Sequence, residues 1–141
     1  MQDDRPLIVM LEDDHERIAR FAAVLSRSFR FLYWRTAHDF IANFPRIPKP
    51  QLIALDHDLF VDHPGDPDPG DGRDVSSYLS TVVPIAPVLI HSTNSHAADS
   101  MLYQLRDSGW KADRISPIGE DWIESDWFPF AVVFQSRNSP R

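Results

Sequence analysis

The chain contains no cysteine, which excludes disulfide bonds and thiolate metal sites. It also lacks an apolar run near the ~20 residues that a transmembrane helix needs, and it lacks the apolar segment of a signal peptide. Positive charge is scarce, because the formal net charge is -7, and this argues against general binding to nucleic-acid backbones. We therefore expect a cytoplasmic protein that does not enter the membrane.

The length and composition are those of an ordinary globular domain. The chain has 141 residues, of which 43% are hydrophobic and 25% are charged, so we expect residues 1–141 to form a single domain. One segment is biased in composition, from Asp62 to Asp74, where aspartates alternate with prolines and glycines. It has too many prolines for an EF-hand calcium loop and lacks the glutamate that closes one, so we interpret it as a mobile lid.

The central stretch of the sequence is LIALDHD, from Leu52 to Asp58. A short apolar run that ends abruptly in carboxylates is typical of a buried parallel strand. In an open α/β sheet, ligands bind outside the carboxyl ends of the strands. Because side chains alternate along a strand, Asp56 and Asp58 should share one face while His57 lies on the other.

A second apolar run, Leu7 to Leu11, also ends in acids, namely Glu12, Asp13 and Asp14. Apolar residues then recur with the spacing of a helix packed on a sheet, at Ile18, Phe21, Ala22 and Leu25. The solvent-facing side of this helix is expected to carry Arg17, Arg20 and Arg27. Two strand ends of the predicted sheet are therefore acidic.

The alternation of strand and helix continues along the chain. Phe29 to Trp34 reads as a strand, and Thr36 with Asp39 predicts the capped start of a short helix. Another helix is expected to begin at Gly72 or Asp74. Pro87 to Ile90 predicts a fourth strand, and the helix after it should stop at Gly109.

The C-terminal part is less regular. Arg114 to Ile118 is expected to be a short fifth strand, and Phe130 to Phe134 is either an added edge strand or packing for the tail. Trp122, Trp127 and Phe128 suggest an amphipathic element, which would offer an interface if these rings are not in the core. Together the elements predict a three-layer, doubly wound α/β fold with five parallel strands in the order 2-1-3-4-5.

Carboxylates that converge at neighbouring strand ends repel one another, so a hard cation such as Mg²⁺ or Mn²⁺ is their economical explanation. The predicted metal ligands are Asp13, Asp14, Asp56 and Asp58. Helix capping and surface charge are the alternative for the first three, and a turn is the alternative for Asp58.

Polar residues beside this acidic edge are candidates for catalysis. An imidazole suits general acid–base chemistry, so His57 and His91 are candidates together with Asp56. If Ser92 faces the site, alternation turns His91 into the layer that covers the sheet, where a hydrogen-bonded core histidine is the other interpretation. Ser92 is a further candidate because it follows the fourth strand, and Asn94 is either a phosphate ligand or a helix cap.

Acids after the first and third strands and a hydroxyl after the fourth, here Asp13, Asp14, Asp56 and Ser92, resemble the phosphoacceptor receiver domains of two-component response regulators. The resemblance spans roughly residues 6–118 and leaves residues 119–141 as an extension. It implies a flavodoxin-like fold and a divalent cation held by the acidic pair, by Asp56 and by the backbone carbonyl of Asp58. It also implies phosphorylation on Asp56 if the chain is a signalling receiver.

The sequence departs from signalling receivers after the fifth strand, where Ser116-Pro117 stands in place of the lysine-proline pair. The strings LDHDL (residues 55–59) and HSTN (residues 91–94) instead resemble a divergent branch, the cyclic-phosphate-processing receiver domains. This resemblance implies a metal-dependent enzyme that acts on phosphoesters.

The sequence is compatible with three functions. The preferred one is a metal-dependent phosphoesterase for a phosphate-containing small molecule or a nucleic-acid end. The alternatives are a receiver phosphorylated on Asp56 and a pseudo-receiver that only binds a protein partner or a second copy of itself.

Overall fold

The structure is a computed structural model that describes residues 3–138. Its centre is a five-stranded sheet in the order β2-β1-β3-β4-β5, and every pair of neighbouring strands is parallel. This confirms the predicted fold class and strand order. The strands are β1 (Leu7–Leu11), β2 (Arg30–Trp34), β3 (Leu52–Leu55), β4 (Val88–His91) and β5 (Ala112–Ile115).

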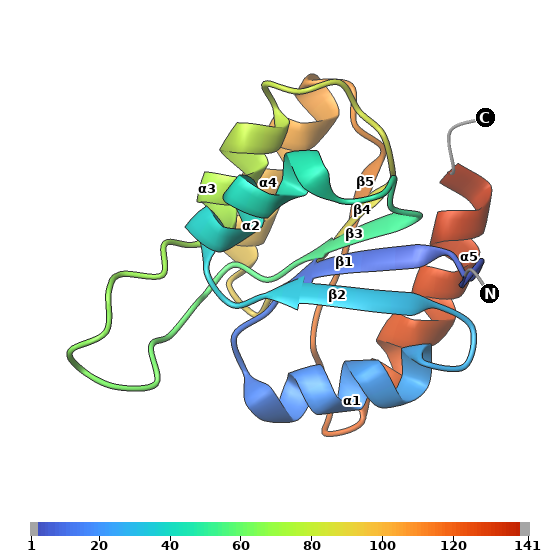
Figure 1. The fold of residues 1–141 in the computed structure, drawn as a ribbon, viewed down its shortest axis with the longest axis horizontal. Coiled ribbons are helices and arrows are strands. Elements are labelled where there is room, and N and C mark those ends of the chain that lie inside the picture. The colour runs from blue at the N-terminus through green and yellow to red at the C-terminus, as the bar shows by residue number, and fades with distance from the viewer. Residues whose placement is uncertain (1–2, 139–141) are drawn as a thin grey trace.

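Helices cover both faces of the sheet, with α1 and α5 on one side and α2, α3 and α4 on the other (Figure 1). The α-helices are α1 (His15–Leu25), α2 (Ala37–Asn43), α3 (Gly72–Leu79), α4 (Ser95–Asp107) and α5 (Phe128–Asn138). A short 3-10 helix, η1 (Phe44–Arg46), follows α2, and a π-helical turn, η2 (Ile123–Trp127), leads into α5. None of the described helices is long and apolar enough to cross a membrane.

Alternating strand residues divide the core into two clusters. In β1, Val9 and Leu11 pack towards α2, α3 and α4, whereas Ile8 and Met10 pack towards α1 and α5. The central strands β1, β3 and β4 are buried along their whole length. This burial on both faces explains why these strands read as continuous apolar runs in the sequence.

The predicted helix ends are present. The Asp39 amide donates to Thr36 Oγ1 at 3.2 Å at the start of α2. At the start of α3, Asp71 and Asp74 form a reciprocal capping box, so this helix begins at Gly72. Gly109 follows α4 with a φ of 92°, a conformation that glycine adopts without the strain a side chain would bring.

The C-terminal part differs from the expectation. The fifth strand is Ala112–Ile115, earlier in the chain than predicted, and Phe130 to Phe134 lies inside helix α5 and does not form an edge strand. An apolar run without alternation is compatible with a strand and with a helix. Here a helix forms because α1 does not cover the whole of its face of the sheet, and α5 covers the rest. Trp122 and Trp127 are buried in that face, so these rings belong to the core and not to an exposed interface.

Candidate functional site

Two buried strands deliver acids to the same edge of the sheet. Leu11 and Leu55, the last residues of β1 and β3, are paired in register. The Asp56 amide donates to Leu11 O at 3.0 Å, and the Glu12 amide donates to Trp34 O at 3.1 Å, so the pairing extends one residue beyond each strand. Glu12 and Asp56 therefore stand side by side at the carboxyl ends of the strands.

Three buried carboxylates, those of Glu12, Asp13 and Asp56, converge here, and we call this group the acidic edge. Oxygen atoms of Glu12, Asp13 and Asp56 all lie within 4.8 Å of one another. Asp13 Oδ2 accepts a hydrogen bond of 2.6 Å from the Phe60 amide, whereas Asp13 Oδ1 is buried without a hydrogen-bond partner. A buried, unpartnered anionic oxygen beside two further carboxylates fits the oxygen ligands that a hard divalent cation prefers.

The same convergence disfavours ionisation of two of the three acids. Burial, assisted by the charge of Glu12, raises the pKa of Asp56 to about 8. Burial also raises the pKa of Asp13. A divalent cation would favour the ionised form of both groups, so the donor set is matched to a positive charge.

Arg17 brings a positive charge into direct contact with these carboxylates. Its Nη2 lies 2.8 Å from Glu12 Oε2, 3.2 Å from Asp56 Oδ2 and 3.8 Å from Asp13 Oδ1, and its Nε lies 3.1 Å from Glu12 Oε1. The prediction that Arg17 faces solvent is wrong, because its side chain points to the acids and only 34% of it is exposed. Arg17 is four residues before Phe21 and so borders the buried side of α1, where it reaches the acids at the strand ends.

Glu12 is held from the other side by His91. His91 Nε2 lies 3.0 Å from Glu12 Oε1, and both side chains are buried. Although burial alone raises the pKa of Glu12, the hydrogen bonds and charges of His91 and Arg17 outweigh it and lower that pKa to about 2. Glu12 is therefore the ionised acid of the cluster.

His91 lies in the layer between the sheet and α1. Its ring is 5.2 Å from that of Phe21, 5.8 Å from that of Trp122 and 6.5 Å from that of Trp127, measured between centroids. Only 1% of the residue is exposed, and its Nδ1 has no hydrogen-bond partner. Alternation along β4 indicated this orientation, and the contact with Glu12 links the buried histidine to the acidic edge.

Asp14 and Asp58, two of the predicted metal ligands, lie outside the three-carboxylate group. Asp14 is exposed and caps α1, where its Oδ1 accepts a hydrogen bond of 2.9 Å from the Arg17 amide. Asp58 Oδ1 lies 2.7 Å from His57 Nδ1. The acidic pair at the end of β1 is thus Glu12 and Asp13, one residue earlier than the sequence suggested.

A cavity of about 430 Å³ lies between the N-termini of α3 and α4. His57 lines it, with Nε2 3.7 Å from Asp71 Oδ2. Asn94 also lines it and caps α4, its Oδ1 accepting from the Ala97 amide at 3.1 Å. Ser92 is buried beside it and its Oγ accepts from the Asn94 amide at 3.1 Å.

The loop after β3 is tethered to the acidic edge near its start. Arg35 forms two hydrogen bonds of 2.8 Å with Asp62 and donates to the backbone carbonyl of Asp13 at 2.9 Å and 3.1 Å. With the Phe60 amide bonded to Asp13, this fixes residues 60–62 next to the carboxylates. The rest of the loop extends away from the sheet (Figure 1).

No lysine occupies the end of β5, because Ser116-Pro117 follows that strand. The lysines of the chain, Lys49 and Lys111, precede β3 and β5 and so lie towards the opposite edge of the parallel sheet. Sequence reasoning missed Glu12 and Arg17 as residues of the acidic edge. The run of acids contained the signal for Glu12, and the spacing of four residues between Arg17 and the buried Phe21 contained one for Arg17.

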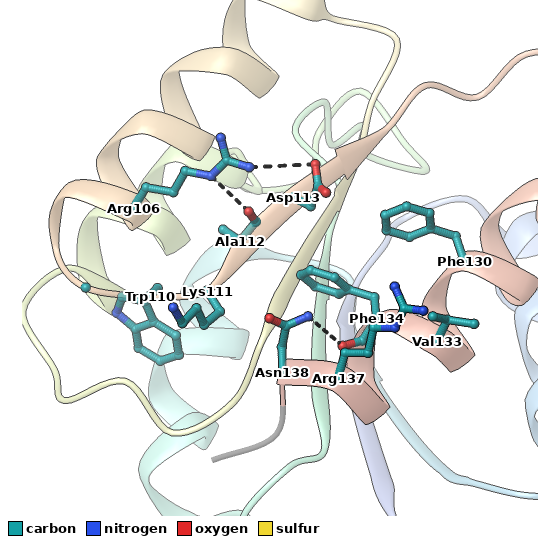
Figure 2. A pocket seen from close by; sticks show the side chains of 11 residues that line it. Arg106, Trp110, Lys111, Ala112, Asp113, Phe130, Val133, Phe134, Arg137 and Asn138 are labelled. Carbon is teal, nitrogen blue, oxygen red and sulfur yellow. Dashed lines mark hydrogen bonds and ion pairs between the residues drawn. The ribbon is translucent and has the colours of Figure 1, made fainter.

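A larger cavity lies elsewhere. It has a volume of about 740 Å³ and opens between the end of α4, the start of β5 and α5, where Phe130 and Phe134 face Lys111 and Arg106 (Figure 2). It contains none of the predicted site residues and lies at the amino end of β5. Asp14, His57 and Asn94 line smaller cavities instead.

Comparisons with known proteins agree with this architecture. The receiver domain of HemR from Leptospira biflexa is 19% identical, with a TM-score of 0.71, covering 97% of this chain and 99% of that one. A CheY-like response regulator receiver domain protein from Methanospirillum hungatei JF-1 is 14% identical, with a TM-score of 0.68, covering 95% and 98%. No curated protein matches the chain.

These likenesses show the receiver fold and nothing finer. The model of the cyclic-phosphate processing receiver domain matches residues 7–107, which include the acidic edge, His57, His91, Ser92 and Asn94. The chain belongs to the cyclic-phosphate processing receiver domain family.

Proposed function

We propose that this receiver domain binds Mg²⁺ or Mn²⁺ at Glu12, Asp13 and Asp56 and hydrolyses a phosphoester, with cyclic phosphates on small molecules or RNA ends as the substrate class. The observation that carries the proposal is the buried, unpartnered Asp13 Oδ1 within a group of three converging carboxylates. The family to which the chain belongs is described as processing cyclic phosphate, and this supports the substrate class.

The bound cation would polarise a phosphoryl oxygen and lower the pKa of a water molecule. The chain supplies the remaining parts from its own residues. Glu12 is kept ionised by Arg17 and His91, so it is ready to ligate at neutral pH. Asp56, whose pKa burial raises to about 8, loses its proton on binding, which makes the affinity increase with pH.

His57 is the general acid–base candidate that the geometry favours. Asp58 Oδ1, 2.7 Å from Nδ1, orients the imidazole. The other ring nitrogen, Nε2, faces the cavity between α3 and α4, where it can give a proton to the departing alkoxide. In this proposal Asp58 acts on His57 and does not ligate the cation through its side chain.

Ser92 and Asn94 orient the phosphoester on the same side. The Ser92 hydroxyl accepts one hydrogen bond from the Asn94 amide and still has its own proton to donate to a phosphoryl oxygen. The N-terminus of α4 and the side chain of Arg73 in the same cavity favour an anionic group. His91 acts at a distance by holding Glu12, and it is a positioning residue.

The test is hydrolysis of 2′,3′-cyclic nucleotides and cyclic-phosphate-ended RNA in the presence of Mn²⁺. We expect ring opening by the wild type, loss in Asp56→Asn and a decrease of ~10²-fold or more in His57→Ala, the size expected for a general acid. His38→Ala is the control, because His38 pairs with Asp39 at an exposed position away from the carboxylates.

A signalling receiver would give the opposite result. Stoichiometric phosphorylation of Asp56 by acetyl phosphate, with no turnover of any cyclic phosphate, would overturn the enzyme proposal. The absence of lysine at the end of β5 argues against efficient phosphorylation, because in receivers that ammonium group neutralises the acyl phosphate.

A further inference from the structure

Arg17 occupies the same carboxylate oxygens that a divalent cation would need. Its guanidinium contacts Glu12 and Asp56 directly and lies 3.8 Å from the unpartnered Asp13 Oδ1. An arginine and a divalent cation held by the same carboxylates repel each other. The position of Arg17 therefore disfavours metal binding unless the side chain moves.

The helix itself does not favour a cation at this position. Arg17 is in the first turn of α1, where the positive end of the helix dipole repels a guanidinium. The position is stabilised by the acids alone, so neutralising those acids in another way removes the reason for the side chain to stay. Arg20, one turn further along, pairs instead with Glu124 at 2.8 Å.

The surroundings give Arg17 room to move. Its side chain is 34% exposed, and it lines an open hollow of about 650 Å³ beside the carboxylates. Acids dominate the rim of this hollow, which raises the local concentration of cations. They include Asp14, Glu16, Glu120, Asp121 and Glu124.

We propose that Arg17 is a movable counter-ion: it holds Glu12 and Asp56 in the metal-free protein, leaves them when Mg²⁺ or Mn²⁺ binds, and then binds an oxygen of the metal-bound phosphoester. This rests on the proposed metal site. The released guanidinium would take over the charge neutralisation for which the chain has no lysine at the end of β5. A planar fork of N–H donors suits the oxygens of a phosphate group.

The proposal predicts that one substitution changes the affinities for the metal and for the anion in opposite directions. Arg17→Gln removes a competitor, so the affinity for Mn²⁺ should increase about tenfold, within the usual size of coupling between sites. The same change removes an anion ligand, so the affinity for orthovanadate in saturating Mn²⁺ should decrease about tenfold. A residue that merely stabilises the fold would move both affinities in the same direction.

Calorimetric titrations of the full chain with Mn²⁺, and then with orthovanadate, test this. Arg20→Gln is the matched control, because Arg20 lies on the same helix without touching the acidic edge, and both affinities should stay at the wild-type value. Arg17→Lys is the second variant if Arg17→Gln folds poorly. Its single ammonium cannot bridge the acids, so Mn²⁺ affinity should again increase.

Equal or weaker Mn²⁺ binding by both Arg17 variants, with binding intact in the wild type and lost in Asp56→Asn, would overturn the role of Arg17 alone. Absence of Mn²⁺ binding in every protein, wild type included, would overturn the metal site and this inference with it. Tighter Mn²⁺ binding with unchanged orthovanadate affinity would overturn the second step, in which Arg17 binds the phosphoester.

Discussion

His91 and Glu12 form a buried pair whose atoms Nε2 and Oε1 are 3.0 Å apart, with 1% and 0% of their side chains exposed. The pair connects two layers of the molecule, because His91 packs among Phe21, Trp122 and Trp127 while Glu12 belongs to the acidic edge. Removing either partner of such a pair leaves a buried charge or polar group uncompensated. The aromatic layer under α1 is therefore energetically tied to the candidate site.

We expect His91→Ala to lower the free energy of unfolding by about 3 kcal/mol, since Glu12 loses a partner and the aromatic layer gains a cavity. Urea unfolding at neutral pH measures this. His96→Ala is the matched control, because His96 is exposed on α4 and should change stability by less than about 0.5 kcal/mol. Equal stability of His91→Ala and the wild type would show that the pair contributes nothing.

The raised pKa of Asp56 predicts that the stability of the fold depends on pH. Burial raises its pKa from 3.8 to about 8, so between these values the folded state retains a proton that the unfolded state releases. The contribution of this group is fully present below the unfolded pKa and is lost as pH rises to about 8. Glu12 acts in a separate window, because its lowered pKa of about 2 makes its contribution disappear only in acid, below the unfolded value of 4.5.

The metal-free Asp56→Asn protein should therefore be more stable than the wild type at pH 8, and this advantage should shrink towards pH 4. Thermal unfolding in the presence of a chelator, repeated across this range, checks both parts. A constant difference between the two proteins over the whole range would contradict the raised pKa.

Much of this site could be predicted from the alternation of side chains along strands. The inward turn of His91 followed from placing Ser92 at the site, and the structure places the histidine in the covering layer. The choice of the acidic pair could not be predicted, because Glu12, Asp13 and Asp14 are consecutive acids. The hydrogen bond of the Glu12 amide extends the strand pairing by one residue, and this decides that Glu12 and Asp13 lie at the site. The sequence alone does not show where the strand ends within three consecutive acids.

Helical periodicity places Arg17 four residues before Phe21, at the border of the apolar stripe, but it does not say what lies beside that border. Arg17 meets the acids because α1 starts directly beside the strand ends. For Phe130 to Phe134 only the edge-strand alternative was wrong, because the segment is part of helix α5 and packs on the core. Its apolar residues have no period, so the sequence was compatible with a strand and with a helix.

A pair of isosteric substitutions tests the assignment of the acids. Mn²⁺ should raise the Tm of the wild type and of Asp14→Asn, because Asp14 caps α1 and asparagine caps equally well. The rise should be lost in Asp13→Asn, which removes the ligand with the unpartnered oxygen. Loss of the rise in Asp14→Asn, with Asp13→Asn unaffected, would restore the assignment made from the sequence.

Gly72, the first residue of α3, lies against the backbone of residues 56 and 57. Its amide donates to His57 O at 2.9 Å, and a Cβ at this position would collide with the Asp56 carbonyl and lie 2.8 Å from His57 Cα. Backbone atoms cannot give way as a flexible side chain can, so Gly72→Ala should push residues 56 and 57 out of place. We expect a loss of about 2 kcal/mol in unfolding free energy, typical of overpacking, together with weaker Mn²⁺ binding. Gly65→Ala is the control, since its Cβ would meet nothing within 4 Å and should change stability by less than about 0.5 kcal/mol. Wild-type stability and Mn²⁺ affinity in Gly72→Ala would mean that α3 can move away from the acidic edge at no cost, and that its close approach does not position Asp56.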